Sequence, residues 1–273
     1  MARDTNFYYS FLVLPAQKRR AIVAVWDFCR AVDDAVDRPN LAGGNPTFEL
    51  ARWQSELTRC YGDEKAEPET AQGIRLKSYI SRFNLPQQPF LDLIDGVAMD
   101  VDRRRYETFE EFYQYCLRVA SSVGLICIEI FGHRNAGTRD YAVALSIALQ
   151  LTNVIRDIPT DLARDRMYLP LEDLHRFNCA ETDLARGLSP PVRALLEFEC
   201  KRARSYYAKA KAMLPAEDRR RLVAAEIMGA IYFAILNKIE RRGYDVFSEV
   251  VRVPRRRRAM IATATWTRTM IGV

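Results

Sequence analysis

Residues that break regular structure and residues that bind zinc are both scarce in this chain of 273 residues. It holds 12 glycines and 12 prolines, and both fractions are below the average usage of about 7% and 5%. It therefore has few of the residues that form the many turns of a β protein. It has two histidines, and its six cysteines show no C-x-x-C spacing, which argues against a zinc site or a disulfide framework. We expect an all-α fold with reduced cysteines.

Long apolar runs are also missing. No run reaches the roughly 18 residues of a membrane span, and the start, MARDTNFYYS, lacks the apolar core of a secretory signal. We therefore expect a cytoplasmic protein. The net charge of +6 is concentrated in residues 241–273, which hold eight arginines against two acidic residues.

Apolar positions recur at helical spacing through most of the chain, which is 49% hydrophobic. The breaks between them are short, so we expect a single all-helical domain over residues 1–273, with a basic C-terminal segment 252–273. The predicted helices are Ala16–Asp37, Phe48–Tyr61, Ala71–Phe83, Pro89–Asp100, Phe109–Phe131, Arg139–Asp157, Pro190–Met213, Pro215–Arg242 and one from Pro254.

The first of these helices carries a stripe of charged side chains on one face. Arg30, Asp33, Asp34 and Asp37 stand at i, i+3, i+4 and i+7, and the opposite face is apolar. Like charges at i and i+4 destabilise a solvated helix, so Asp33 and Asp37 need a compensating partner. For this segment alone, a solvated acidic face is an equally good interpretation.

A second polar stripe lies more than a hundred residues further on. Gln150, Asn153, Asp157 and, less regularly, Asp161 stand at i, i+3, i+7 and i+11, beside Arg156. Two such stripes can face each other across a helix-lined cavity and share Mg²⁺, or Mn²⁺ in its place, because both ions prefer carboxylate and amide oxygens. Mg²⁺ completes its shell with water and phosphate, so we expect a diphosphate there, bound by the neighbouring arginines Arg30, Arg156, Arg164 and Arg166.

Other chemistries that use paired acids fit less well. A carboxylate di-iron bundle needs two Glu-x-x-His pairs, and the chain has one, Glu172–His175. A glycosidase pair of carboxylates would not call for the accompanying arginine and asparagine. No glycine-rich phosphate loop or nucleotide fingerprint appears, so we expect no NADPH. The basic segment lacks interleaved aromatic residues, so we expect no nucleic-acid partner.

Several segments together resemble one enzyme family, the squalene/phytoene synthases, which are all-helical and join two prenyl diphosphates head to head. The resemblance rests on NFYYSFLVLP, CRAVDDAVD, GVAMDVDRRRYETFEEFYQYCLRVASSVGL, QLTNVIRDIPTDLARDRMYLP and EIMGAIYFAILNKIERRGYDVF. The shape of YCLRVASSVGL is most similar to presqualene diphosphate synthases of bacterial hopanoid pathways. This implies a bundle around a central cavity that condenses two molecules of farnesyl diphosphate. A phytoene or dehydrosqualene synthase, or a non-catalytic scaffold of the same fold, are the alternatives.

The resemblance also implies roles for individual residues. Asp33, Asp37, Asp157 and Asp161 would hold the metal ions and act in catalysis, with Asp34 and Asn153 as further ligands. Gln150, Arg30, Arg156 and Arg166 would bind the diphosphates, Phe7 and Tyr8 would flank the entrance, and Tyr232 would line the cavity near the diphosphates. Arg118 would face the reacting carbons.

This chain departs from the family pattern beside its second acidic segment. Pro159 removes a backbone donor and could kink the helix before Asp161, and Thr160 stands where a glutamate is common. An allylic cation also needs a cavity without water. The candidate residues for its apolar wall are Phe11, Trp26, Phe28, Val119, Leu125, Leu149 and Phe233. Each of them also fits an ordinary helix core.

The basic segment has three open interpretations. Arg255–Arg258 precede an apolar stretch with Trp266, a composition that can lie on an anionic membrane. Some of these arginines could instead cap a diphosphate, or the segment could be a solvated helical end.

Overall fold

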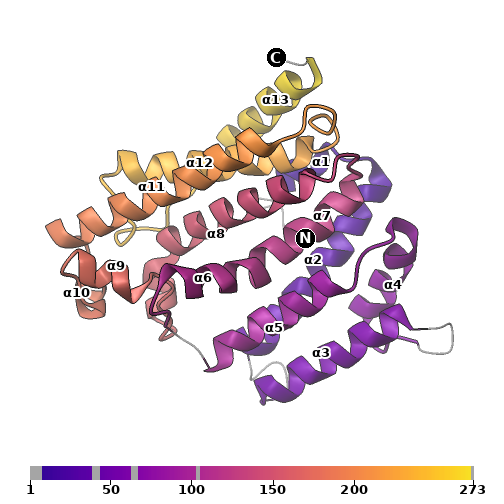
Figure 1. Ribbon diagram of the computed structural model, residues 1–273, viewed down its shortest axis with the longest axis horizontal. Coiled ribbons are helices and arrows are strands. Elements are labelled where there is room, and N and C mark those ends of the chain that lie inside the picture. Colours follow the sequence, from indigo (N-terminus) through magenta and orange to yellow (C-terminus); the bar gives the residue numbers. More distant parts are fainter. Residues whose placement is uncertain (1–7, 39–43, 63–66, 103–104, 272–273) are drawn as a thin grey trace.

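The computed structural model describes residues 8–38, 44–62, 67–102 and 105–271, and within these ranges it contains helices and connecting turns but no strand (Figure 1). The elements are α1 (Tyr8–Leu12), α2 (Ala16–Asp37), α3 (Pro46–Tyr61), α4 (Ala71–Phe83), α5 (Gln88–Asp102), α6 (Phe109–Cys116), the π-helical turn η1 (Leu117–Ser121), α7 (Ser122–Phe131), α8 (Thr138–Leu162), α9 (Leu171–Arg176), α10 (Glu181–Arg186), α11 (Pro190–Met213), α12 (Val223–Arg241) and α13 (Arg255–Ile271). The predicted all-α fold is confirmed.

The predicted helices differ from the observed ones mainly near two prolines. Helix α8 continues through Pro159 to Leu162, five residues beyond the predicted end at Asp157. Helix α12 begins at Val223 rather than Pro215. The buried carboxylate of Asp218 explains this later start, because it accepts hydrogen bonds from the backbone amides of Arg134 and Asn135, at 2.8–2.9 Å, and so holds residues 216–222 in turns against the loop before α8.

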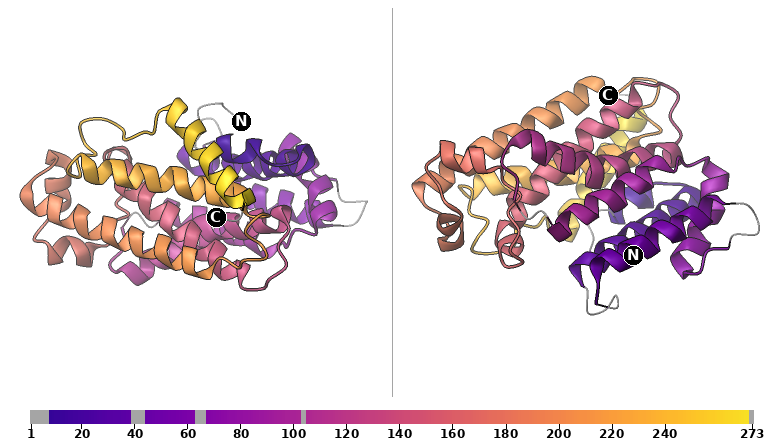
Figure 2. Two further views of the ribbon diagram at one scale, coloured as in Figure 1. Left: turned by 90° about the horizontal axis from the view of Figure 1, so that it is seen from above. Right: turned by 60° about the horizontal axis from the view of Figure 1, so that its bottom comes forward.

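Helix α8 occupies the middle of the bundle, where it packs against η1, α7, α11 and α12. Helices α3 and α4 lie at one side of the bundle, where α5 separates α3 from α7, and α13 crosses α12 at the other side (Figures 1 and 2). The continuous helical stretch Phe109–Phe131 is long and apolar enough to cross a membrane by length and composition alone. Here η1 and α7, its second half, pack against α5 and α8 inside the bundle.

Helices α2 and α8 run in the same direction, and this brings the two acidic segments together. At one end, Lys18 near the start of α2 donates a hydrogen bond of 2.6 Å to the carbonyl oxygen of Phe131, just before α8 begins. At the other end, Asp37 at the end of α2 pairs with Arg164 and Arg166, which follow α8. The C-terminal ends of both helices therefore meet.

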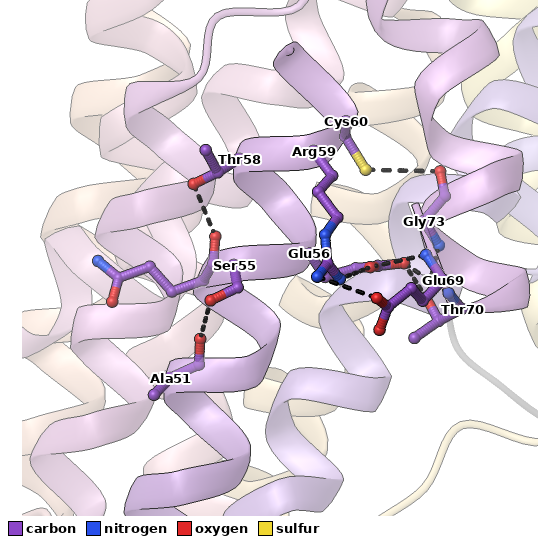
Figure 3. A network of polar contacts seen from close by, with 10 residues as sticks. Ala51, Ser55, Glu56, Thr58, Arg59, Cys60, Glu69, Thr70 and Gly73 are labelled. Carbon is purple, nitrogen blue, oxygen red and sulfur yellow. Dashed lines mark hydrogen bonds and ion pairs between the residues drawn. The ribbon is translucent and has the colours of Figure 1, made fainter. Parts of the chain in front are cut away.

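A buried glutamate fastens α4 to α3 (Figure 3). Glu56, whose side chain is 1% exposed, accepts hydrogen bonds from the backbone amides of Glu69 and Thr70 at 2.9 and 2.7 Å and from the Thr70 hydroxyl at 2.6 Å. Thr70 in turn caps α4 by accepting from the Gly73 amide. A Cβ atom at Gly73 would lie 2.1 Å from Glu56 Oε1, so the close contact of the two helices requires glycine there.

Candidate active site

The helices enclose a cavity of about 520 Å³, lined by residues of α1, α2, α5, α6, η1, α7, α8 and α12 and of the turn that follows α8. Its two ends differ in chemistry. We call the end where α2 and α8 finish the carboxylate end, because it gathers aspartates and arginines from both acidic segments and from α5. Its residues are Arg30, Asp33, Asp37, Asp100, Asp157, Asp161, Arg156, Arg164 and Arg166.

Ion pairs at the carboxylate end connect the two acidic segments directly. Asp37 lies 3.0 Å from Arg164 Nη1 and 2.7 Å from Arg166 Nη1. Within α8, Arg156 Nε donates to its neighbour Asp157 at 2.8 Å. These guanidinium groups carry the fork of donors that suits phosphate oxygens as well as carboxylates, so the arginines needed for a diphosphate are already in place.

The remaining carboxylates are not fully compensated. Burial, together with the neighbouring charge of Asp37, raises the pKa of Asp33 to about 7. Burial and the charge of Asp157 raise the pKa of Asp161 to about 7 as well. Both carboxylates therefore lie where a bound cation would favour their ionised forms.

The carboxylate end has the donor chemistry that Mg²⁺ prefers. Across the part of the chain that the structure describes, no three acidic, histidine or cysteine side chains already form a metal cluster. Mg²⁺ does not need such a cage, because it usually keeps several waters and takes one or two carboxylates plus substrate phosphates. The buried Oδ1 atom of Asn153 has no hydrogen-bond partner and lines the same cavity. An unpartnered amide oxygen beside crowded carboxylates fits a hard cation.

Asp100 also lies at the carboxylate end, although its place in the sequence predicted no role for it. It accepts hydrogen bonds from the hydroxyls of Tyr115 at 3.0 Å and Tyr168 at 2.9 Å. Burial raises its pKa, against the opposing effect of Arg166 and the two phenols. The sequence spacing could have indicated a role for Asp100. It stands three residues after Val97 and seven after Leu93, on the buried face of α5, where an unpaired carboxylate is energetically unfavourable.

Most residues expected at the site do line the cavity. Trp26, Arg30, Gln150, Asn153 and Tyr232 are on its wall, together with the acidic residues of both segments apart from Asp34. Pro159 does not displace Asp161, because α8 continues to Leu162 and both Asp157 and Asp161 face the cavity. Of the apolar wall candidates, Phe11, Val119 and Leu149 also line it, whereas Phe28, Leu125 and Phe233 do not.

The placements expected for Asp34 and Arg118 are wrong. Asp34 follows Asp33 by one residue and so is rotated about 100° around α2. Its Oδ1 lies 3.4 Å from Arg30 Nε and 3.7 Å from Arg38 Nε, and its side chain is not among those that line the cavity. Arg118, in η1, donates to the carbonyl oxygen of Gln114 at 3.2 Å and does not line the cavity, because η1 turns the next two residues toward it instead.

Tyr8 is not among the residues that line the cavity, and its ring packs edge-on against Tyr9 with the ring centroids 5.5 Å apart. That Tyr8 flanks the entrance stays a prediction. Phe7 lies outside the described residues. The arginines of residues 252–258 are likewise absent from the cavity wall, and a role for them in capping a diphosphate stays a prediction.

An all-α bundle with opposed aspartate segments at one end of an apolar cavity defines an enzyme that transfers prenyl groups. The model of the squalene/phytoene synthase family matches residues 1–257. The chain belongs to this family, as its sequence motifs predicted.

The similar proteins include phytoene, dehydrosqualene and squalene synthases. The chain is 36% identical to the 15-cis-phytoene synthase of Synechocystis sp. over 97% of its length and 82% of the relative. It is 38% identical to the 15-cis-phytoene synthase of Synechococcus elongatus, over 91% and 84% of the two chains. Among solved structures, a dehydrosqualene synthase superposes with a TM-score of 0.85 at 28% identity, over 98% of this chain and 93% of that one. The squalene synthase HpnC of Alicyclobacillus acidocaldarius gives 0.78 at 31%, over 88% and 89%.

These comparisons correct the predicted product. The sequence analysis favoured a presqualene diphosphate synthase of a hopanoid pathway, from the shape of one short segment. The relatives matched at 36–38% identity over most of the chain are phytoene synthases instead, so that prediction is wrong. In the segment YCLRVASSVGL, Arg118 does not line the cavity, whereas Tyr115, Val119, Ala120, Val123 and Gly124 do.

Proposed function

We propose that this protein is a phytoene synthase, which joins two molecules of geranylgeranyl diphosphate head to head and releases two diphosphates. The observation that carries this proposal is the convergence of Asp33 and Asp37 with Asp157 and Asp161 at one end of an otherwise largely apolar cavity. The identity to phytoene synthases over most of the chain supports the twenty-carbon substrate.

The carboxylate end provides for binding and for ionisation. Asp33, Asp37, Asn153, Asp157 and Asp161 would hold Mg²⁺, or Mn²⁺ in its place. When bound, the ions neutralise the charge that develops on a departing diphosphate. The arginines of this end bind the phosphate oxygens through charge-assisted hydrogen bonds: Arg30, Arg156, Arg164 and Arg166.

The reaction balances without an external reductant. The C1–O bond of the first substrate breaks, and its diphosphate leaves with the electron pair. The C2=C3 double bond of the second substrate attacks the allylic cation, and loss of a proton closes a cyclopropane. The second diphosphate then leaves, the ring opens as the two C1 atoms join, and loss of another proton gives the central double bond of phytoene. Oxygen atoms of the released diphosphate serve as proton acceptors, and no NADPH is consumed.

The apolar part of the wall protects the cations from water. Trp26, Val119 and Leu149 line the cavity between its two ends, and an aromatic face stabilises a passing positive charge. Tyr232 lines the wall near Arg156, where its hydroxyl can orient the diphosphate that Arg156 binds.

Incubation of the purified protein with Mg²⁺ and geranylgeranyl diphosphate, without NADPH, tests this function. We expect phytoene and two equivalents of diphosphate, identified by mass spectrometry and a phosphate assay. Farnesyl diphosphate in a parallel reaction is the control for chain length. Consumption of farnesyl but not geranylgeranyl diphosphate would reassign the substrate, and consumption of neither would support a non-catalytic scaffold.

We also propose that the protein is cytoplasmic and contacts the inner face of the membrane through α13. Arg255, Arg256 and Arg257 are exposed, and Met260 and Trp266 expose 71% and 43% of their surface. Each basic residue near an anionic surface contributes about 1 kcal/mol. Vesicles containing anionic lipid should therefore sediment the protein, whereas neutral vesicles should not. Replacement of the three exposed arginines by glutamate should abolish sedimentation, and binding that survives this change would contradict the proposal.

A further inference from the structure

The end of the cavity opposite the carboxylates has its own closure. We call it the apolar end and define it by the first or last cavity-lining residue of four helices: Ile22 of α2, Phe131 of α7, Tyr141 of α8 and Ala225 of α12. Tyr141 precedes Asp157 by sixteen residues on the same helix. At 1.5 Å per residue, these two side chains start about 24 Å apart along α8.

The direction of the other helices agrees with this placement. On α2, Ile22 is fifteen residues from Asp37, about 22 Å at the same rise. Lys18 donates a hydrogen bond to the carbonyl oxygen of Phe131 and so closes the bundle behind the apolar end. A prenyl chain whose diphosphate lies at the carboxylate end therefore extends toward Tyr141.

Tyr141 differs from its apolar neighbours because its position is fixed by a hydrogen bond. Its side chain is almost completely buried, and its hydroxyl donates to Glu226 Oε1 at 2.6 Å. Burial, together with the charge of Glu226, raises the pKa of Tyr141 well above its ordinary value, so the phenol stays a donor. Glu226 lies in the first turn of α12, where a negative charge is favourable.

This contact joins the start of α8 to the start of α12 across the apolar end. A leucine or phenylalanine in this place could change rotamer to make room for a longer chain. The Tyr141 ring cannot move without losing a buried hydrogen bond, and leaving buried polar groups unpaired is unfavourable. The wall at this end is therefore stiffer than its composition suggests.

We propose that Tyr141, held by Glu226, closes the apolar end of the cavity and sets the longest prenyl chain that the enzyme accepts. This inference rests on the proposed function, since it assumes a prenyl diphosphate as substrate. A chain longer by one isoprene unit must displace the ring, whereas a chain that ends short of it need not. Tyr141 is thus a specificity-determining residue and takes no part in the chemical steps.

The test compares prenyl diphosphates of fifteen, twenty and twenty-five carbons with the wild type, Tyr141→Ala and Tyr141→Phe. For Tyr141→Ala we expect the ratio of kcat/KM for the twenty-five-carbon substrate over the twenty-carbon substrate to rise at least about tenfold, as for other pockets that gain room. Tyr141→Phe keeps the ring and loses only the hydrogen bond, so its ratio should fall between those of the wild type and Tyr141→Ala. An unchanged ratio in Tyr141→Ala would overturn the proposal.

Tyr207→Ala is the matched control. Tyr207 is a partly buried tyrosine of α11 whose hydroxyl lies 3.0 Å from that of Thr152, and it does not line the cavity. It should lower stability without changing the ratio, and an equal shift in Tyr207→Ala would also overturn the proposal. If Tyr141→Ala does not fold, Tyr141→Leu keeps part of the apolar volume and still removes the closure.

A binding measurement separates this inference from the proposed function. Non-hydrolysable thiolodiphosphates of the same three chain lengths can be titrated with Mg²⁺ by quenching of tryptophan fluorescence, because Trp26 lines the cavity. If turnover fails in every variant, the proposed function is wrong. The ratio of the Kd values for the twenty-five- and twenty-carbon analogues still tests Tyr141: a shift toward the longer analogue in Tyr141→Ala supports the inference, and no shift contradicts it.

Discussion

The two ends of the cavity differ in charge and in how their side chains are held. At the carboxylate end, five aspartates and four arginines meet, and burial together with a neighbouring carboxylate raises the pKa of Asp33 and of Asp161 to about 7. At the apolar end, the helices are joined by the hydrogen bond between Tyr141 and Glu226 and by the one from Lys18 to the carbonyl oxygen of Phe131. The carboxylate end has charged groups that a bound ligand can pair with, whereas the polar groups described at the apolar end already have partners within the protein. Changes at the first should alter activity, and changes at the second should alter selectivity or stability.

Removal of divalent cations should have the largest effect. The carboxylate end lacks a complete metal cluster among the described residues, so we expect Mg²⁺ to bind there together with diphosphate. Chelation should reduce diphosphate release from geranylgeranyl diphosphate below detection and leave the circular dichroism spectrum unchanged. Restoration by Mg²⁺ or Mn²⁺, but not by Ca²⁺, is the control. Full turnover in excess chelator would contradict this view of the site.

Neighbouring aspartates on α2 should differ sharply. Asp33 lines the cavity and Asp34 does not, so Asp33→Ala should lower kcat/KM at least about 100-fold, the usual effect of losing one group that stabilises developing charge. Asp34→Ala loses only ion pairs at 3.4 and 3.7 Å and should retain most activity. Steady-state kinetics of the two variants provide the measurement, and equal losses would show that Asp34 also reaches the substrate.

A pair of aromatic residues on α2 sharpens the contrast between wall and core. Phe28 is fully buried between Trp53 and Phe90, so Phe28→Ala should lower the free energy of unfolding by about 3–5 kcal/mol. Trp26 lines the cavity and is only half-buried, so Trp26→Ala should cost less stability and more activity. Urea unfolding and product assays on both variants test this, and a larger loss of stability for Trp26→Ala would contradict it.

The smallest effect concerns pH and lies away from the cavity, in the capping of α4. Burial alone would raise the pKa of Glu56, but the hydrogen bonds from Thr70 and Glu69 outweigh it and hold the pKa below its ordinary value. A lowered folded-state pKa stabilises the protein above the unfolded-state pKa, and this contribution is lost as the pH falls through the folded-state value. Glu56→Gln should therefore be less stable than the wild type at pH 7, by roughly 1–3 kcal/mol, and the difference should shrink toward pH 3. A difference that grows on acidification would contradict this assignment.

The sequence predicted the long helices well, because their apolar periodicity extends over several turns. Helices α2 and α11 have the bounds that were predicted. The short helices α9 and α10, of six residues each, carry too few positions for a period to show. The π turn η1 was not predicted, since it interrupts a stretch whose composition is helical throughout. The expected orientation of Arg118 was wrong for this reason.

The site was predicted in part. The spacing of Asp33 and Asp37, and of Asp157 and Asp161, identified the faces that line the cavity. Spacing could not decide between Asp33 and Asp34, because both lie within the same broad polar face and only the neighbouring helices show which one is enclosed. Asp100 belongs to no stripe of its own, so its place beside Tyr115 and Tyr168 could not be read from α5 alone.

The sequence by itself determined the helices, the two acidic faces and the family, because each depends on residues close together in the chain or on motifs read in order. Only the tertiary structure decided which acidic residues share the cavity, that Asp100 joins them, and that Tyr141 meets Glu226 at the other end. These contacts join residues from 15 to 129 positions apart. No local pattern encodes them, since they depend on the parallel course of α2 and α8 and on the packing that fixes it.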